Sequence, residues 1–245
     1  MLYVRRSLRL RRAKSKALLC KFINLIFRHC LKKIRIFAAI IKINISKTIK
    51  AMSTGYQIHE QEEVHYVTFQ IVKWIDIFTR KVYRDIIIDS LRYSQQYKAL
   101  EVYAYVIMSN HVHLMIRCGR GRLSDTIREI KSFTARKILE TIDTESESRR
   151  DWILNLFGFC AKQHKRNEQY QVWTHENHAE IVFSNAFMDQ KIKYIHDNPV
   201  RAGIVERAED YLYSSARNYA GLEGLIKVDG IYTPIEKMSL MRSLK

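Results

Sequence analysis

Apolar and polar residues follow two different periods between residues 60 and 120. Alternation with a period of two, rich in β-branched and aromatic residues, indicates strands, and apolar residues three and four apart indicate helices. The predicted segments are a strand over Glu63–Val72, a helix over Thr79–Tyr97 with Thr79 as its N-cap, and strands over Leu100–Met108 and His111–Cys118. Only Ser109 and Asn110 separate the last two strands, which is the length of a tight hairpin.

The same patterns predict the elements of the second half of the chain. They are a helix over Asp125–Ile142 capped by Ser124, a helix over residues 151–166 that breaks near Gly158, strand-like pieces within residues 170–184, and a helix over Asn185–Asn198. We expect Pro199 to end this last helix, because proline lacks the N–H that a helix interior needs.

The order of these elements is strand, helix, strand, strand, helix, and then a late strand and helix. That order predicts an α+β fold of the ferredoxin-like type, in which a split βαβ unit forms an antiparallel sheet with helices packed on it. This fold serves many functions, so the activity has to be inferred from individual residues.

Charge is distributed unevenly along the 245 residues. The formal net charge of +17 is typical of nucleic-acid-binding proteins, but residues 1–51 hold 15 of the 42 Lys and Arg residues and no Asp or Glu. The rest of the chain holds 27 basic and 25 acidic residues and is close to neutral. Nucleic-acid binding by this larger part therefore needs local sites rather than a broad basic surface.

Residues 1–51 form a basic extension that has more than one interpretation. Its apolar runs are too short for a membrane span or for the core of an export signal. One interpretation is a basic helix on a membrane or nucleic-acid surface. We favour another, in which translation begins at Met52, the extension is not part of the native protein, and residues 52–245 form the working domain.

The four cysteines of the chain form no CxxC pair. They therefore predict neither a zinc site nor a disulfide framework. Because the sequence has no recognisable export signal, we expect a cytoplasmic protein with no membrane partner.

The predicted strand over His111–Cys118 carries two histidines, His111 and His113, in an apolar run. Side chains two apart on a strand point to one face, so both imidazoles can bind a single metal ion. The structural alternative is that one histidine is exposed and the other is hydrogen-bonded in the sheet. On the metal hypothesis, we expect both to be exposed ligands whose loss leaves the fold intact.

The predicted helix over Asn185–Asn198 supplies a second pair, Tyr194 and Asn198, which share a helix face because they are four apart. A tyrosine oxygen is a covalent nucleophile when it is set against an activated electrophile. An asparagine amide oxygen is a neutral ligand that suits Mg²⁺ or Mn²⁺. Each residue also has a structural interpretation, Tyr194 as a packed aromatic and Asn198 as a helix cap.

Two long blocks of sequence carry a specific resemblance. The blocks "YAYVIMSNHVHLMI" (103–116) and "KYIHDNPVRAGIVERAEDYLYSSARNY" (193–219) resemble the single-tyrosine HUH transposases, in particular the REP-associated tyrosine transposases of bacteria. The likeness runs from about Val64 to Gly221 and includes the helical segment "KSFTARKIL". Ser109 stands where many relatives have proline, and the basic segment before Met52 has no counterpart in the family.

The resemblance implies a fold of the HUH endonuclease type and a reaction on single-stranded DNA. Tyr194 would attack a backbone phosphorus, release a 3′-OH and hold the 5′ side as a phosphotyrosine. Mg²⁺ or Mn²⁺ on His111, His113 and Asn198 would polarise and position that phosphate. The DNA partner would fold into imperfect-palindrome hairpins, and in some relatives a homodimer completes each site.

Three basic residues of the helix over Asp125–Ile142 are expected either to contact DNA phosphates or to form an ordinary solvated face; they are Arg128, Lys131 and Arg136.

Three other functions stay open from the sequence. They are a non-catalytic nucleic-acid-binding protein on the same fold, a metal-dependent phosphodiesterase that uses water, and a domesticated transposase. A covalent protein–DNA adduct distinguishes the first two from the tyrosine mechanism.

Overall fold

The computed structural model describes residues 58–120, 122–163 and 169–230, which all belong to one unit of the chain, residues 55–245. The basic segment 1–51 and the boundary expected at Met52 lie outside the described residues. Within the described ranges, no helix is both long enough and apolar enough to cross a membrane.

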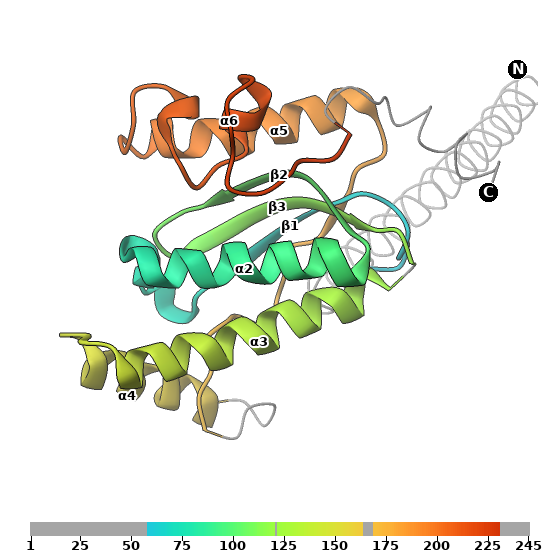
Figure 1. The fold of residues 1–245 in the computed structure, drawn as a ribbon. Helices are drawn as coiled ribbons and strands as arrows, with labels where there is room; N and C mark the ends of the chain where they lie inside the picture. The colour runs from blue at the N-terminus through green and yellow to red at the C-terminus, as the bar shows by residue number, and fades with distance from the viewer. Residues whose placement is uncertain (1–57, 121, 164–168, 231–245) are drawn as a thin grey trace, which may run out of the picture. The chain divides into compact units, whose positions relative to one another are not determined.

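The described residues form strands, α-helices and short 3-10 turns in the order expected from the sequence (Figure 1). In chain order they are β1 (His65–Gln70), η1 (Val72–Trp74), η2 (Ile77–Thr79), α2 (Lys81–Lys98), β2 (Leu100–Ile107), β3 (His111–Cys118), α3 (Leu123–Thr144), α4 (Arg150–Lys162), β4 (Glu180–Ile181), α5 (Asn185–Arg201), η3 (Ala208–Asp210) and α6 (Ala216–Tyr219).

The strands form one antiparallel sheet in the order β2-β3-β1-β4. Strands β1 and β2 run in the same direction, are joined through α2, and have β3 between them, which is the split βαβ arrangement. The α+β, ferredoxin-like prediction is therefore confirmed. The register places Thr68 opposite His113 and Gln70 opposite His111.

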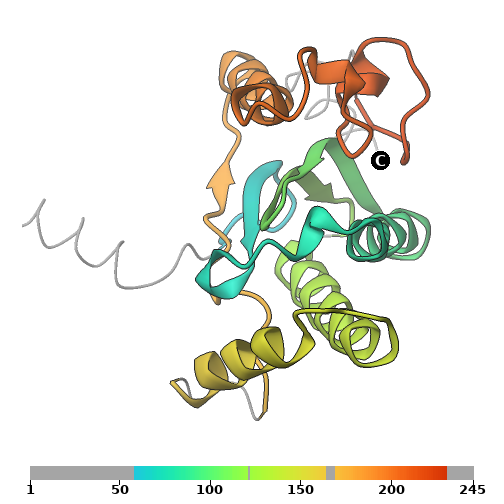
Figure 2. The ribbon, with the colours of Figure 1, turned by 90° about the vertical axis from the view of Figure 1, so that its left-hand side faces the viewer.

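Helices cover both faces of this sheet. Helices α2 and α3 lie side by side on one face, and α5 lies on the other (Figures 1 and 2). The face of α2 that packs inward follows helical spacing at Tyr83, Ile87 and Leu91, each at most 1% exposed. Strand β2 is buried along almost its whole length because both of its faces are covered.

The helix caps expected from the sequence are wrong. Helix α2 begins at Lys81, and the Thr79 hydroxyl donates to the carbonyl of Asp76 (2.9 Å) instead of capping the helix. Helix α3 begins at Leu123, so Ser124 lies inside its first turn. Both helices start without a side-chain cap, which fits the general finding that tertiary packing supplies most helix stability.

Two expected helix breaks are also wrong. Helix α4 runs through Gly158, where a glycine costs about 1 kcal/mol and the packing of buried Ile153 and Phe157 offsets it. Helix α5 continues two residues past Pro199, because a proline in the last turn removes only one backbone hydrogen bond. The helix ends before Gly203, whose φ of 68° is left-handed and whose N–H bonds back to Val200 (2.9 Å).

Candidate active site

His111 and His113 lie on the central strand β3, on the face of the sheet that α5 covers. Their ring centroids are 4.6 Å apart, so the two imidazoles converge on one place. The expectation that both are exposed is wrong for His113, which is only 6% exposed, whereas His111 is half-buried. The reason is that His113 lies farther under α5 and packs against aromatic rings from two other elements.

Hydroxyl groups from β1 hold the His113 ring. Its Nδ1 is 2.8 Å from the Tyr66 hydroxyl and 2.8 Å from Thr68 Oγ1, and the Tyr66 ring stacks on the imidazole with centroids 5.5 Å apart. Tyr66 and Thr68 reach the same ring because alternate residues of a strand share a face. These contacts engage Nδ1 and leave Nε2 as the nitrogen of His113 that could bind a metal ion.

Asn110 fixes the orientation of His111. The Asn110 amide nitrogen donates to the backbone carbonyl of Trp74 (3.3 Å), so its oxygen is the atom that lies 2.7 Å from His111 Nδ1. An amide oxygen only accepts, and Nδ1 must therefore carry the proton. The lone pair of His111 is then on Nε2, as in His113, and both rings can present the same nitrogen to one metal ion.

Burial keeps both imidazoles neutral. It lowers the pKa of His111 below its ordinary value, and it lowers the pKa of His113 to about 3, with smaller effects from the charges of His111 and Lys191. The neutral imidazole is the form that binds metals.

Helix α5 brings Tyr194 to the histidine pair within the same subunit. The Tyr194 ring centroid is 5.4 Å from that of His113 and 6.3 Å from that of Tyr66, in edge-on arrangements. Its side chain is still 37% exposed, so the phenol is accessible to a large substrate. The Tyr194 ring thus lies against His113, which in turn contacts His111.

Asn198 lies one turn beyond Tyr194 on α5. Its amide nitrogen donates to the Tyr194 carbonyl (2.7 Å), which leaves Oδ1 as the atom that can act as a ligand. In the part of the chain that the structure describes, no group of three or more His, Cys, Asp or Glu residues could hold a metal ion. Among the described residues, the structure brings the two imidazoles together but shows no contact between Asn198 and either of them. Two imidazole nitrogens and one amide oxygen are ligand types that suit a divalent ion which keeps several waters.

Two basic residues on α5 lie over aromatic rings of the site. The ammonium of Lys191 lies 4.2 Å from the Tyr66 ring centroid and pairs with Glu180 (2.9 Å). The guanidinium of Arg201 lies 5.2 Å from the Tyr194 ring centroid.

Comparison with known proteins identifies the family. The family model described as "Transposase IS200 like" matches residues 59–198, more than half of the chain, and this range includes both histidines, Tyr194 and Asn198. The chain belongs to the IS200-like transposase family. Membership makes it a DNA-processing protein of a family whose enzymes cleave and join DNA and are typically metal-dependent.

Solved structures are similar to the transposase at low sequence identity. One is a REP-associated tyrosine transposase bound to a REP hairpin, with 16% identity, coverage of 73% of this chain and 93% of that chain, and a TM-score of 0.47. Another is a putative transposase from Deinococcus radiodurans, with 17% identity, coverage of 58% and 95%, and a TM-score of 0.32. No curated protein matches the sequence.

Helix α3, which carries the predicted basic residues, covers the face of the sheet opposite α5 (Figure 1). The Lys131 ammonium lies over the Phe69 ring (5.7 Å), whereas the neighbouring Thr68 contacts His113 from the other face. The Lys131 ammonium donates to the Thr174 carbonyl (2.7 Å) and to Asn177 Oδ1 (2.6 Å), and burial lowers its pKa to about 8. Arg128 pairs with Asp125 (2.8 Å). Arg128 and Arg136 line a hollow of about 720 Å³ between α2 and α3, away from the catalytic candidates.

Several residues that surround the site are not predicted from the sequence. Tyr66 and Thr68 carried a usable signal, because both fall on one face of a predicted strand. Lys191 carried another, since it precedes Tyr194 by three residues and so shares its helix face. Asn110 and Glu180 carried none, because their roles depend on which strands pair.

Proposed function

We propose that the protein cleaves and rejoins single-stranded DNA through a covalent 5′-phosphotyrosine intermediate. Tyr194 is the nucleophile, and His111, His113 and Asn198 are ligands of Mg²⁺ or Mn²⁺. The observation that carries the proposal is the meeting of the Tyr194 phenol with the histidine pair in one subunit, with 5.4 Å between the Tyr194 and His113 rings.

The reaction breaks one P–O bond and forms another. The Tyr194 oxygen attacks the phosphorus, and the bond from phosphorus to the 3′ oxygen breaks. The phenol loses a proton, and the leaving 3′ oxygen takes up a proton to become the 3′-OH. An incoming 3′-OH reverses the step and releases Tyr194. Strands are joined in this way without external energy, because the phosphodiester energy is kept in the phosphotyrosine bond.

The residues around the phenol orient the reacting groups. Asn110 holds the His111 ring, and the Tyr66 and Thr68 hydroxyls hold the His113 ring, so each Nε2 has a fixed direction. When bound, the divalent ion supplies positive charge to the oxygens of the scissile phosphate. Lys191 and Arg201 bind neighbouring phosphates and keep the strand in line with Tyr194.

The proposed substrate is DNA that folds into imperfect-palindrome hairpins, as the motifs shared with the REP-associated tyrosine transposases imply. A homodimer is compatible with the site but is not required by it, because the phenol and the imidazoles come from one subunit.

Arg128 and Arg136 of α3 are proposed as contacts for DNA outside the reacting phosphate. Lys131 is the weakest member of that group, since its ammonium is engaged by Thr174 and Asn177.

The test is an adduct assay with labelled hairpin DNA. The protein is incubated with Mg²⁺ or Mn²⁺, and a denaturing gel is expected to show a DNA–protein band that is absent for Tyr194→Phe. Tyr93→Phe, at an exposed tyrosine on α2, is the matched control and should form the band. Phe keeps the ring, so Tyr194→Phe should change the free energy of unfolding by less than about 1.5 kcal/mol and should still bind uncut DNA.

Each negative result of this assay has a distinct meaning. Cleavage without a covalent band would indicate a phosphodiesterase that uses water, with Tyr194 only structural. Binding without any cleavage, with either metal, would indicate a non-catalytic DNA-binding protein. An adduct formed by Tyr194→Phe would show that another residue is the nucleophile.

A further inference from the structure

An exposed tryptophan lies beside the histidine pair. The Trp74 side chain is 60% exposed, and its ring is edge-on to the His111 ring with 6.0 Å between centroids. Trp74 comes from the turn after β1, whereas His111 begins β3. Neither helix packing nor the proposed chemistry explains why a large apolar ring faces solvent at this place.

The backbone at Trp74 is held in an unfavourable conformation. Lys73 and Trp74 have φ values of 54° and 56°, a left-handed conformation that residues other than glycine rarely adopt. Buried residues before and after the turn, Val72 and Ile75, anchor it in the core. Such strain persists only where the surrounding structure imposes it, and it is concentrated at functional sites.

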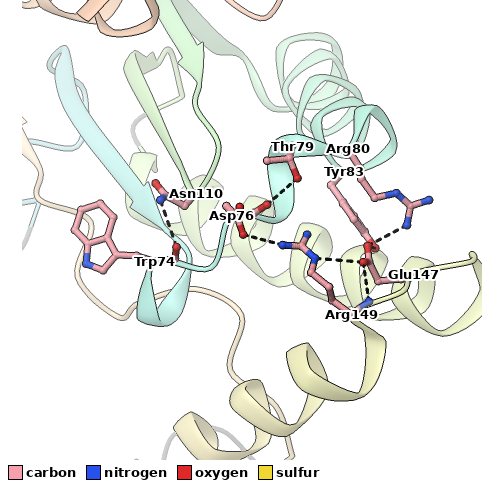
Figure 3. Close-up of polar contacts among 8 residues, drawn as sticks. All are labelled: Trp74, Asp76, Thr79, Arg80, Tyr83, Asn110, Glu147 and Arg149. Carbon is pink, nitrogen blue, oxygen red and sulfur yellow. Dashed lines mark hydrogen bonds and ion pairs between the residues drawn. The ribbon is translucent and has the colours of Figure 1, made fainter. Parts of the chain in front are cut away.

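One asparagine connects this turn to the metal-binding candidate. The Asn110 amide nitrogen donates to the Trp74 carbonyl (3.3 Å) (Figure 3). The Asn110 side-chain oxygen accepts from His111 Nδ1 (2.7 Å), and its backbone carbonyl accepts from the Ile71 N–H (2.9 Å). The backbone of Trp74 is therefore tied to the residue that orients His111, and the indole itself contacts the His111 ring edge-on. A flat aromatic surface, held beside the place where a phosphate would be bound, is preorganised for one neighbouring base.

We propose that Trp74 is a stacking platform for the base of a nucleotide adjacent to the scissile phosphate. The proposal rests on the proposed function, because it takes the phosphate to be bound at His111 and His113. Every base has a π-face, so an indole binds single-stranded DNA with little sequence preference. Stacking on the indole would keep the strand extended across the histidine pair, in reach of Tyr194.

The test measures binding with DNA that lacks single bases. Tyr194→Phe protein is used so that no cleavage occurs, and an abasic site is placed in turn at each position around the cleavage site. One position is expected to weaken binding by about 5- to 100-fold. In the Trp74→Ala,Tyr194→Phe protein, affinity for intact DNA should fall by a similar factor, and the penalty at that one position should disappear.

Trp152 provides a matched control, because it is 52% exposed and lies on α4, a different element. Trp152→Ala should leave affinity and the abasic profile unchanged. Tryptophan fluorescence provides a second measurement in a Trp152→Phe protein, where Trp74 is the exposed indole and Trp173 is only 5% exposed. DNA should quench the fluorescence of this protein, and the quenching should be lost when Trp74→Ala is added. Trp74→Phe should retain part of the positional effect.

Specific outcomes overturn the proposal. One is an abasic profile that is unchanged by Trp74→Ala; another is a loss of affinity that is equal at every position. A third is a change in oligomeric state on sedimentation with the abasic profile intact, which would make Trp74 a contact between copies. If the adduct assay fails but one position still shows the Trp74 effect, the proposed reaction is wrong and Trp74 stacks on a base of bound, uncut DNA. If the adduct forms but the positional effect is absent, only the stacking role is removed.

Discussion

At the scale of single residues, the two histidines of β3 differ in what their loss would do to the fold. His113 is buried, and its Nδ1 forms hydrogen bonds with the hydroxyls of Tyr66 and Thr68. His113→Ala leaves those two hydroxyls without their partner, so it should lower the free energy of unfolding by about 1–3 kcal/mol. His111→Ala, at a half-buried ring, should cost less than about 1 kcal/mol.

Urea unfolding and metal-dependent cleavage separate these two effects. Both variants should lose cleavage, but only His113→Ala should unfold at a clearly lower urea concentration. Equal stability losses would contradict the asymmetry of burial. Cleavage with an unchanged metal response in both variants would remove the metal-site assignment.

Asn198 should contribute less to metal binding than either histidine. Its side chain supplies one neutral oxygen, and water can replace one ligand of a hydrated ion such as Mg²⁺. Asn198→Ala should therefore raise the metal concentration needed for half-maximal cleavage while retaining activity at saturating metal. The measurement is a cleavage titration with Mg²⁺ and Mn²⁺; complete loss of activity at every metal concentration would give Asn198 a larger role.

At the scale of elements, Glu147 ties the segment between α3 and α4 to the start of α2. Its side chain is 2% exposed and accepts from Arg80 (3.0 Å), from the Tyr83 hydroxyl (3.1 Å) and from the Arg149 N–H (3.2 Å) (Figure 3). Burial raises the pKa of Glu147, but these hydrogen bonds together outweigh burial and leave the pKa below its ordinary value.

This network gives a pH-dependent contribution to stability. Because the folded-state pKa of Glu147 is depressed, the contribution is complete above the ordinary glutamate pKa near ~4.3 and is lost as the pH falls below it. Glu147→Gln should cost about 1–3 kcal/mol at neutral pH, and the difference from wild type should shrink below about pH 4.

Urea unfolding at a series of pH values measures this difference. Glu140→Gln is the control, because Glu140 forms an exposed pair with Lys137 and should change stability by no more than about 0.5 kcal/mol. A Glu147→Gln penalty that stays constant down to pH 3 would show that the charge of Glu147 does not contribute.

At the scale of the whole molecule, the division of charge leads to a prediction about the extension. Residues 1–51 carry 15 basic and no acidic residues, and the family match begins at residue 59. A protein beginning at Met52 should therefore fold and keep hairpin binding and adduct formation. If the extension adds phosphate contacts, DNA binding by the full chain should fall more steeply with salt than DNA binding by the Met52 protein.

Fluorescence anisotropy with labelled hairpin DNA at several salt concentrations compares the two proteins. A Met52 protein that is insoluble, or that no longer binds DNA while the full chain does, would contradict the prediction. The adduct assay on the same samples shows whether any loss affects binding or the reaction.

The sequence by itself determined the features that depend on short-range geometry. Strand and helix periods gave the element order, and hence the ferredoxin-like fold, because side-chain direction repeats every two residues in a strand and every 3.6 in a helix. The same geometry placed His111 with His113 on one strand face and Tyr194 with Asn198 on one helix face. Helix ends were less predictable, as Pro199 and Ser124 show, since packing outweighs capping and local propensity.

Tertiary structure decided everything that depends on contact between distant segments. Tyr66 binds His113 across 47 residues of chain because β1 pairs with β3, and Tyr194 reaches His113 because α5 packs on that face. Tertiary contacts also bring Trp74 against His111, while the sheet separates Lys131 from both histidines. Periodicity gives the direction of a side chain from its own element, but register and packing select the neighbour that it meets.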